Sequence, residues 1–158
     1  MTAPMLRTYA LALALVSVIG CSKKDGDGGS DKPAAPTKLP KLGLQLDIPG
    51  SVEVTDGVAG DGHMLMGSGI GAMHVDLMKE PQTLEQAKED ASMYTPKNLK
   101  EEKLADGWVL TYENTGSMGK NLFVEVRRDI DGKSYKCGTT GSDDRTQKVL
   151  AACKTLRK

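Results

Sequence analysis

The chain has 158 residues, 39% of them hydrophobic, and its 21 basic residues balance 21 acidic ones. That is enough for one domain of ordinary size, but it provides no basic surface for nucleic acid or anionic lipid. With one Trp, one Phe and four Tyr, the chain also has few rings on which nucleobases or sugars can stack.

The first twenty residues have the layout of a secretory signal peptide. Arg7 precedes an apolar run over residues 9–19, which is shorter than the roughly 20 apolar residues that span a bilayer. The tetrapeptide Val-Ile-Gly-Cys that ends at Cys21 resembles the lipobox of bacterial lipoprotein signals. This resemblance implies cleavage just before Cys21 and a membrane anchor of two or three acyl chains on that residue. The alternative is an ordinary signal peptide, or an uncleaved anchor, in which Cys21 occurs by chance.

The residue after Cys21 bears on location. Ser22, where an Asp would favour retention at the inner membrane, resembles the pattern of lipoproteins sorted to the outer membrane. We therefore expect a lipid-anchored protein of the cell envelope, on the outer membrane and facing the periplasm.

Export also bears on the other two cysteines. Outside a reducing cytoplasm, Cys137 and Cys153 form an even pair once Cys21 carries lipid, so we predict a disulfide between them. The alternative is two free, buried thiols. Neither has the close CxxC partner that cysteine-based zinc sites tend to use.

A change of composition divides the rest of the chain. Residues 21–40 contain almost no large apolar side chain, so we predict a lipidated cysteine followed by a disordered tether. Residues 41–158 are predicted to form a single domain.

The first half of this domain has short apolar runs between turn residues. We predict strands over 42–48, 52–55, 63–66 and 72–78, the last two as a hairpin that turns at Gly67-Ser68-Gly69 and places Met64 and Met66 against Met73, Val75 and Leu77. Thr83 and Gln86 form a capping box, which predicts a helix that begins there and ends before Pro96.

The second half repeats the alternation of strands and turns. We predict strands over 98–104, 108–113, 121–128 and 133–138, with Asp131-Gly132 as a two-residue hairpin turn and 114–120 as a polar loop. A last helix is expected from Ser142, with an apolar stripe of Val149, Leu150, Cys153 and Leu156. Cys153 on this stripe would lie near Cys137 on the last strand.

These elements predict an α+β fold in which an antiparallel sheet packs with two helices. Three segments resemble the Mog1/PsbP-like fold, including envelope lipoproteins of the LpqN type: Leu-Gly-Leu-Gln-Leu-Asp-Ile-Pro-Gly-Ser, Thr-Leu-Glu-Gln-Ala and Ser-Tyr-Lys-Cys-Gly-Thr-Thr. The resemblance implies an α/β sandwich that binds other proteins or helps to assemble complexes, mostly without enzymatic activity. It transfers no functional residue.

One polar constellation is a candidate metal site. A two-residue Ser68-Gly69 turn would place His63 opposite His74 and Asp61 opposite Asp76, on one face and within reach of Zn²⁺ or another divalent ion. We favour the other interpretation, in which these residues form the solvent side of an ordinary hairpin, and we assign no metal ligands. A loop of odd length would put the two histidines on opposite faces.

No catalytic set emerges from the sequence. Two histidines and no cysteine left free by the disulfide leave little material for nucleophilic catalysis. We therefore expect a non-enzymatic, membrane-tethered module without a cofactor, which binds another envelope protein through a sheet face or the 114–120 loop. The alternative function is binding of a metal or small ligand at the hairpin of His63 and His74.

Overall fold

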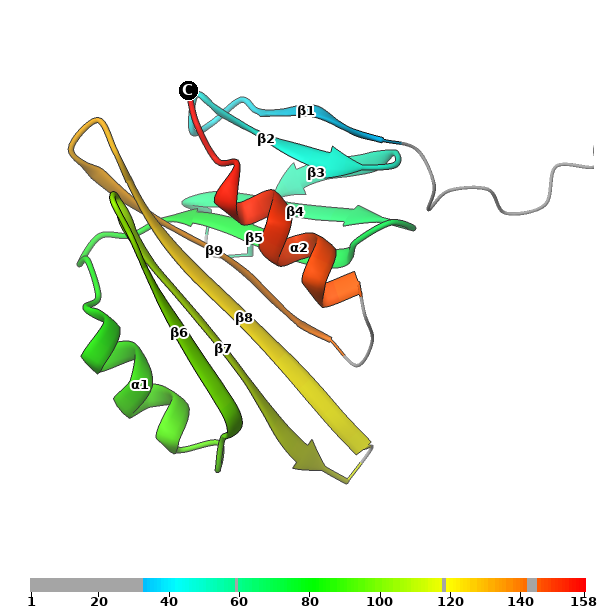
Figure 1. Cartoon of the computed structure of the whole chain (residues 1–158). Helices are drawn as coiled ribbons and strands as arrows, with labels where there is room; N and C mark the ends of the chain where they lie inside the picture. The colour runs from blue at the N-terminus through cyan, green and yellow to red at the C-terminus, as the bar shows by residue number, and fades with distance from the viewer. Residues whose placement is uncertain (1–32, 59, 118, 142–144) are drawn as a thin grey trace, which may run out of the picture.

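The computed structural model describes residues 33–58, 60–117, 119–141 and 145–158 (Figure 1). The predicted signal peptide over 1–20, Cys21 and the first part of the predicted tether lie outside these ranges. The elements are β1 (Ala34–Leu39), β2 (Leu44–Pro49), β3 (Val52–Asp56), β4 (Gly62–Gly67), β5 (Gly71–Leu77), α1 (Leu84–Ser92), β6 (Lys97–Leu104), β7 (Gly107–Gly116), β8 (Gly119–Ile130), β9 (Lys133–Gly141) and α2 (Arg145–Lys154).

The strands form one large sheet and one small ribbon. The large sheet has seven strands in the order β3-β4-β5-β9-β8-β7-β6, and all its neighbours are antiparallel. β1 and β2 pair separately as an antiparallel ribbon. The molecule is therefore a small α+β protein dominated by antiparallel sheet, as the pattern of predicted strands and helices indicated.

The main core lies on the face of the large sheet that packs against α2 and the β1-β2 ribbon. The alternating apolar residues of β2 are buried: Leu44, Leu46 and Ile48. This confirms the period-two pattern of that segment. They meet buried side chains of the sheet and of α2, among them Leu65, Met73, Val75, Val126 and Val149.

A second, smaller core lies on the opposite face of the sheet. There α1 packs Leu84, Ala87 and Ala91 against Trp108, Leu110 and Tyr112 of β7. Figure 1 shows the two helices on opposite sides of the strands β6–β9. Because α1 packs mainly on β7, it covers only part of its face.

Two local sequence signatures are confirmed. Thr83 accepts a hydrogen bond from the amide of Gln86, whose side chain accepts one from the Thr83 amide, so the capping box starts α1. Asp131 and Gly132 have φ values of 50° and 73°, the left-handed conformation that a two-residue type I′ hairpin requires. This turn joins β8 to β9.

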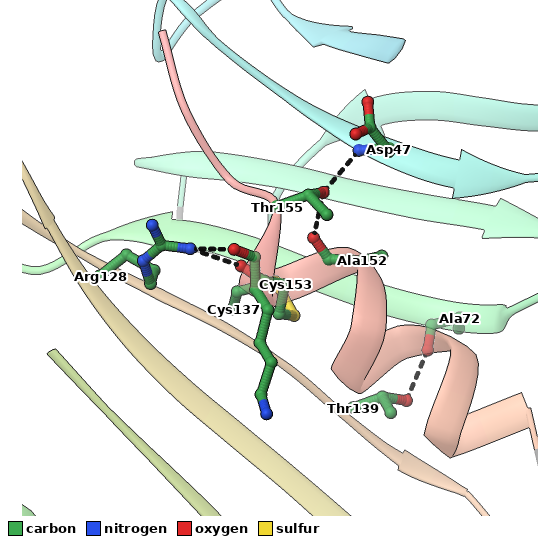
Figure 2. Close-up of a disulfide and its surroundings, with 9 residues drawn as sticks. Asp47, Ala72, Arg128, Cys137, Thr139, Ala152, Cys153 and Thr155 are labelled. Atoms are coloured by element: carbon green, nitrogen blue, oxygen red, sulfur yellow. Dashed lines mark hydrogen bonds between the residues drawn. A yellow bond between two sulfur atoms is a disulfide. The ribbon is translucent and has the colours of Figure 1, made fainter. Parts of the chain in front are cut away.

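The predicted disulfide between Cys137 and Cys153 is present and ties β9 to α2, with Cα atoms 5.6 Å apart (Figure 2). Both cysteines are fully buried. Nearby, Arg128 donates hydrogen bonds to the carbonyl oxygens of Cys153 and Lys154 at the end of α2, and pairs with Asp106 at 2.7 Å. A guanidinium at a helix C-terminus complements the helix dipole.

The predicted boundary between tether and domain is wrong at its distal end. Residues 34–39 form β1, paired along its length with β2, and Leu39 is completely buried. The composition of this stretch hides the strand, because Leu39 is its single large apolar residue and its other side chains are mostly exposed. The ordered domain therefore begins before residue 41.

In the part of the chain that the structure describes, no helix has the length and apolar character needed to cross a membrane.

Candidate functional site

The candidate site is the part of the α1-side face that α1 leaves uncovered, which we call the open face. Strand register defines it, because directly paired residues point to the same side of a sheet. One row across the strands pairs Met66 with Ala72 and Thr140 with Phe123; the next pairs Met64 with His74 and Gly138 with Glu125. A third row contains Asp76 and Lys136, which pair with one another.

The open face has an apolar strip along its first row. Met66 on β4 is 48% exposed, and Tyr94, just after α1, is 50% exposed. Phe123 lies beside Tyr94 with ring centroids 5.6 Å apart, and it stacks on Tyr112 at 4.5 Å. Helix α1 thus positions an exposed tyrosine at the edge of the stack.

A charged cluster follows in the next rows. The ammonium nitrogen of Lys136 lies 2.6 Å from one carboxylate oxygen of Glu125, and the Tyr112 hydroxyl donates a hydrogen bond of 3.4 Å to the other. Burial raises the pKa of Tyr112 above its usual range, and the Glu125 carboxylate raises it further. Lys136 and Glu125 neutralise one another's charge.

His74 lies half-buried beside this cluster. Burial lowers the pKa of its imidazole from the ordinary value of 6.5, and Lys136 lowers it further, while Asp76 and Glu125 act in the opposite direction. The neutral imidazole is therefore the favoured form near pH 7.

A pocket of about 210 Å³ joins the aromatic and charged parts of the open face. It is lined by His74, Tyr94, Tyr112, Phe123, Glu125 and Lys136, together with backbone and side chains of β8 and β9. This pocket offers a bound molecule both apolar contact, from its aromatic rings, and hydrogen bonds, from a carboxylate, an amine and an imidazole.

The structure does not bring together His63, His74, Asp61 and Asp76, the four residues considered as a candidate metal site. Three residues rather than two separate the paired ends Gly67 and Gly71, so the register pairs His63 with Val75 and Met64 with His74. The two histidines therefore point to opposite faces, which is the outcome expected of an odd loop. For the same reason Met64 and Met66 point away from Met73 and Val75 rather than toward them. Among the described residues, no group of three or more His, Cys, Asp or Glu side chains can hold a metal ion.

His63 has a structural place in the main core. It is 4% exposed, its Nε2 accepts a hydrogen bond from the Lys41 amide at 3.1 Å, and its Nδ1 lies 3.1 Å from the carbonyl oxygen of Thr55. A neutral ring with its proton on Nδ1 satisfies both contacts. His63 thus joins β3 and β4 to the turn between β1 and β2.

The two candidate aspartates separate as well. Asp61 lies before β4 and forms an ion pair with Lys79 at 2.8 Å, whereas Asp76 is on the open face, two residues from His74. Only His74 and Asp76 of the four candidate residues therefore belong to this face.

The predicted loop over 114–120 is wrong too. β7 extends to Gly116 and β8 begins at Gly119, with Asn114 paired to Asn121. The amide of Asn121 donates a 2.8 Å hydrogen bond to the Asn114 side chain. The segment lacks an apolar period because this end of the hairpin carries exposed or half-exposed residues on both strands.

Sequence reasoning missed four residues of the open face: Tyr94, Phe123, Glu125 and Lys136. Their neighbours Val124, Val126 and Cys137 alternate with them and are buried. This alternation assigns the odd residues of β8 to one face, but only the strand order reveals which other side chains share it.

Together the fold and this face define a small, sheet-dominated α+β protein with one partly uncovered sheet surface. No protein-family model matches the chain, and a search of curated proteins finds none with significant similarity to it.

Proposed function

We propose that this chain is a non-enzymatic lipoprotein of the cell envelope, anchored by lipid on Cys21, whose domain binds another envelope protein through the open face. The finer assignments are part of the proposal: a Mog1/PsbP-like fold, and a position on the outer membrane facing the periplasm. The lipobox-like tetrapeptide before Ser22 supports the anchor and the location.

The observation that carries the binding role is the exposed apolar strip on the open face. Met66 and Tyr94 are each about half exposed, although both belong to a face whose other half is covered by α1. Apolar surface of this kind, bordered by polar groups, is typical of sites that bind other molecules.

A protein is the occupant that this surface favours. The strip and the charged rows extend over β4, β5, β9 and β8, so they form a broad surface with only a small hollow. The paired Glu125 and Lys136 present no net charge to an anionic lipid or a nucleic acid. We expect a partner with its own apolar strip at the centre of the contact.

The anchor is tested by incorporation of labelled palmitate. The full chain is expected to take up the label and to fractionate with membranes, and Cys21→Ser is expected to abolish the labelling. Equal labelling of the variant would overturn the anchor without bearing on the partner.

The partner is tested by crosslinking in intact cells. A photoreactive amino acid replaces Ala72 or Thr140, which are exposed on the open face, and in a matched control replaces Ala151, which is exposed on α2. One specific adduct from both open-face positions, absent from the control, supports the proposal. Adducts from all three positions alike, or from none, contradict binding through this face.

A further inference from the structure

Two methionines and a histidine lie on adjacent strands of the open face, and one of them, Met66, also belongs to the apolar strip. Met64 on β4 pairs directly with His74 on β5, so their Cβ atoms are about 4.5–5.5 Å apart. Met66 follows two residues along β4 on the same face, within diagonal reach of a long side chain at His74. The register therefore places one imidazole and two thioethers on the same face of two adjacent strands.

The imidazole of His74 is available to a ligand. Both ring nitrogens of His63 are engaged by backbone groups, whereas those of His74 have no hydrogen-bond partner among the described residues.

The two thioethers are accessible as well. Met66 is 48% exposed and Met64 is half-buried, whereas Met73 on the other face of the sheet is 1% exposed. Methionine is not a residue that strands favour on an exposed face, where β-branched and aromatic side chains predominate. Met64 and Met66, two residues apart on β4 and next to His74, offer two thioether sulfurs and one imidazole as ligands for a metal ion.

These ligands favour a soft, monovalent metal ion. Thioether sulfur selects Cu(I) over hard cations such as Mg²⁺ and Ca²⁺, and imidazole is compatible with copper. A site without a coordinating carboxylate or thiolate has little to offer Zn²⁺, which takes Cys, His and carboxylate ligands. This donor set differs from the candidate divalent site considered in the sequence, and of that candidate's residues it retains only His74.

We propose that Met64, Met66 and His74 form a three-ligand site for Cu(I). The site does not depend on the lipid anchor or on a protein partner.

Titration of the full chain in detergent with Ag(I) tests the site. Ag(I) shares the closed d shell of Cu(I) and needs no reductant, so the disulfide stays intact. All proteins carry Cys21→Ser, which removes a competing thiol. We expect one equivalent to bind with a dissociation constant near or below about 1 µM, and Zn²⁺ to bind far more weakly.

Variants assign the ligands. Met64→Leu with Met66→Leu keeps the apolar volume, a change that folded proteins tolerate, and is expected to weaken Ag(I) binding by more than about 100-fold. His74→Gln is expected to act in the same direction. Met93→Leu is the matched control, because Met93 is 76% exposed at the end of α1 and away from the site.

The NMR signals of the methionine methyl groups provide a second measurement, which needs no substitution of the proposed ligands and so does not depend on whether the variants fold. In the otherwise unchanged chain, Ag(I) should shift the ε-methyl signals of Met64 and Met66 and leave those of Met73 and Met93 in place. Absence of binding in the micromolar range, undiminished binding by the double variant, or shifts confined to other methionines would each overturn the proposal.

Discussion

Tyr112 illustrates how one residue joins the second core to the open face. Its ring is 3% exposed and stacks on Phe123, while its hydroxyl reaches Glu125. Burial and the neighbouring carboxylate both favour the neutral phenol, so the pKa of Tyr112 is raised. Its neutral hydroxyl can keep donating to Glu125 across the physiological range of pH.

This shift predicts an alkaline effect on stability. The unfolded phenol titrates near pH 10, whereas the folded one keeps its proton above that pH. The contribution of Tyr112 to folding is therefore fully present below about pH 10 and is lost as the pH rises through the folded pKa. Phenolate absorbance of the folded chain should lack the Tyr112 step, so Tyr112→Phe should give the same titration curve as the unaltered chain until unfolding begins.

A second variant tests the contribution of the Glu125 carboxylate to that shift. Glu125→Gln removes the negative charge beside the hydroxyl and leaves Lys136 unpaired, and both changes favour the phenolate. An additional phenolate should therefore form at a lower pH in folded Glu125→Gln than in the unaltered chain. Identical curves for the two folded proteins would show that the carboxylate has no influence on Tyr112.

At the scale of elements, β1 is the segment whose role departs most from its composition. Its buried end, Leu39, belongs to the main core with Leu44 and Leu46. We predict that Leu39→Ala lowers the free energy of unfolding by about 2–5 kcal/mol, the range for removal of a buried leucine side chain. Urea unfolding of the full chain measures this difference.

The neighbouring Lys38 provides the control for that measurement. It is exposed in the same strand, so Lys38→Ala should change the free energy of unfolding by no more than about 0.5 kcal/mol. If Leu39→Ala is equally silent, β1 does not contribute to the core and the segment behaves as the tether that its composition suggests.

Sequence patterns predicted a structural feature correctly where that feature depends only on residues that are close in the sequence. The capping box at Thr83, the Asp131-Gly132 turn and the alternation in β2 each depend on neighbours in sequence, and each is confirmed. The disulfide followed from compartment and from the positions of Cys137 and Cys153 on the last strand and helix.

The candidate site was harder to predict because it depends on pairing between elements. A change of one residue in the turn after β4 moves His63 to the opposite face of the hairpin from His74. Composition also misled at β1, which is held by its ribbon partner β2 and one buried leucine. No period within a single segment shows that Phe123 and His74 share a pocket, because β9 lies between their strands.

At the scale of the whole molecule, the last residues of the chain join the small ribbon to the rest. The backbone of Arg157 exchanges two hydrogen bonds with that of Gln45, at 2.8 and 2.9 Å, and its guanidinium pairs with Asp47 at 2.8 Å. Leu156 is 1% exposed in the main core. Thr155 accepts a hydrogen bond of 2.7 Å from the Asp47 amide (Figure 2).

We therefore predict that removal of residues 156–158 releases the β1-β2 ribbon while the sheet and the disulfide persist. The truncation deletes a buried leucine and both backbone hydrogen bonds to β2, and leaves Asp47 without its guanidinium partner. Limited trypsin digestion followed by mass spectrometry should show faster cleavage after Lys38 in β1 and after Lys41 in the turn between β1 and β2. Arg157→Ala is the control, since an ion pair of this exposure contributes about 0–1 kcal/mol and the backbone pairing remains. Equal resistance of the truncated and full chains at these lysines would mean that packing on the sheet and on α2 is enough to hold the ribbon.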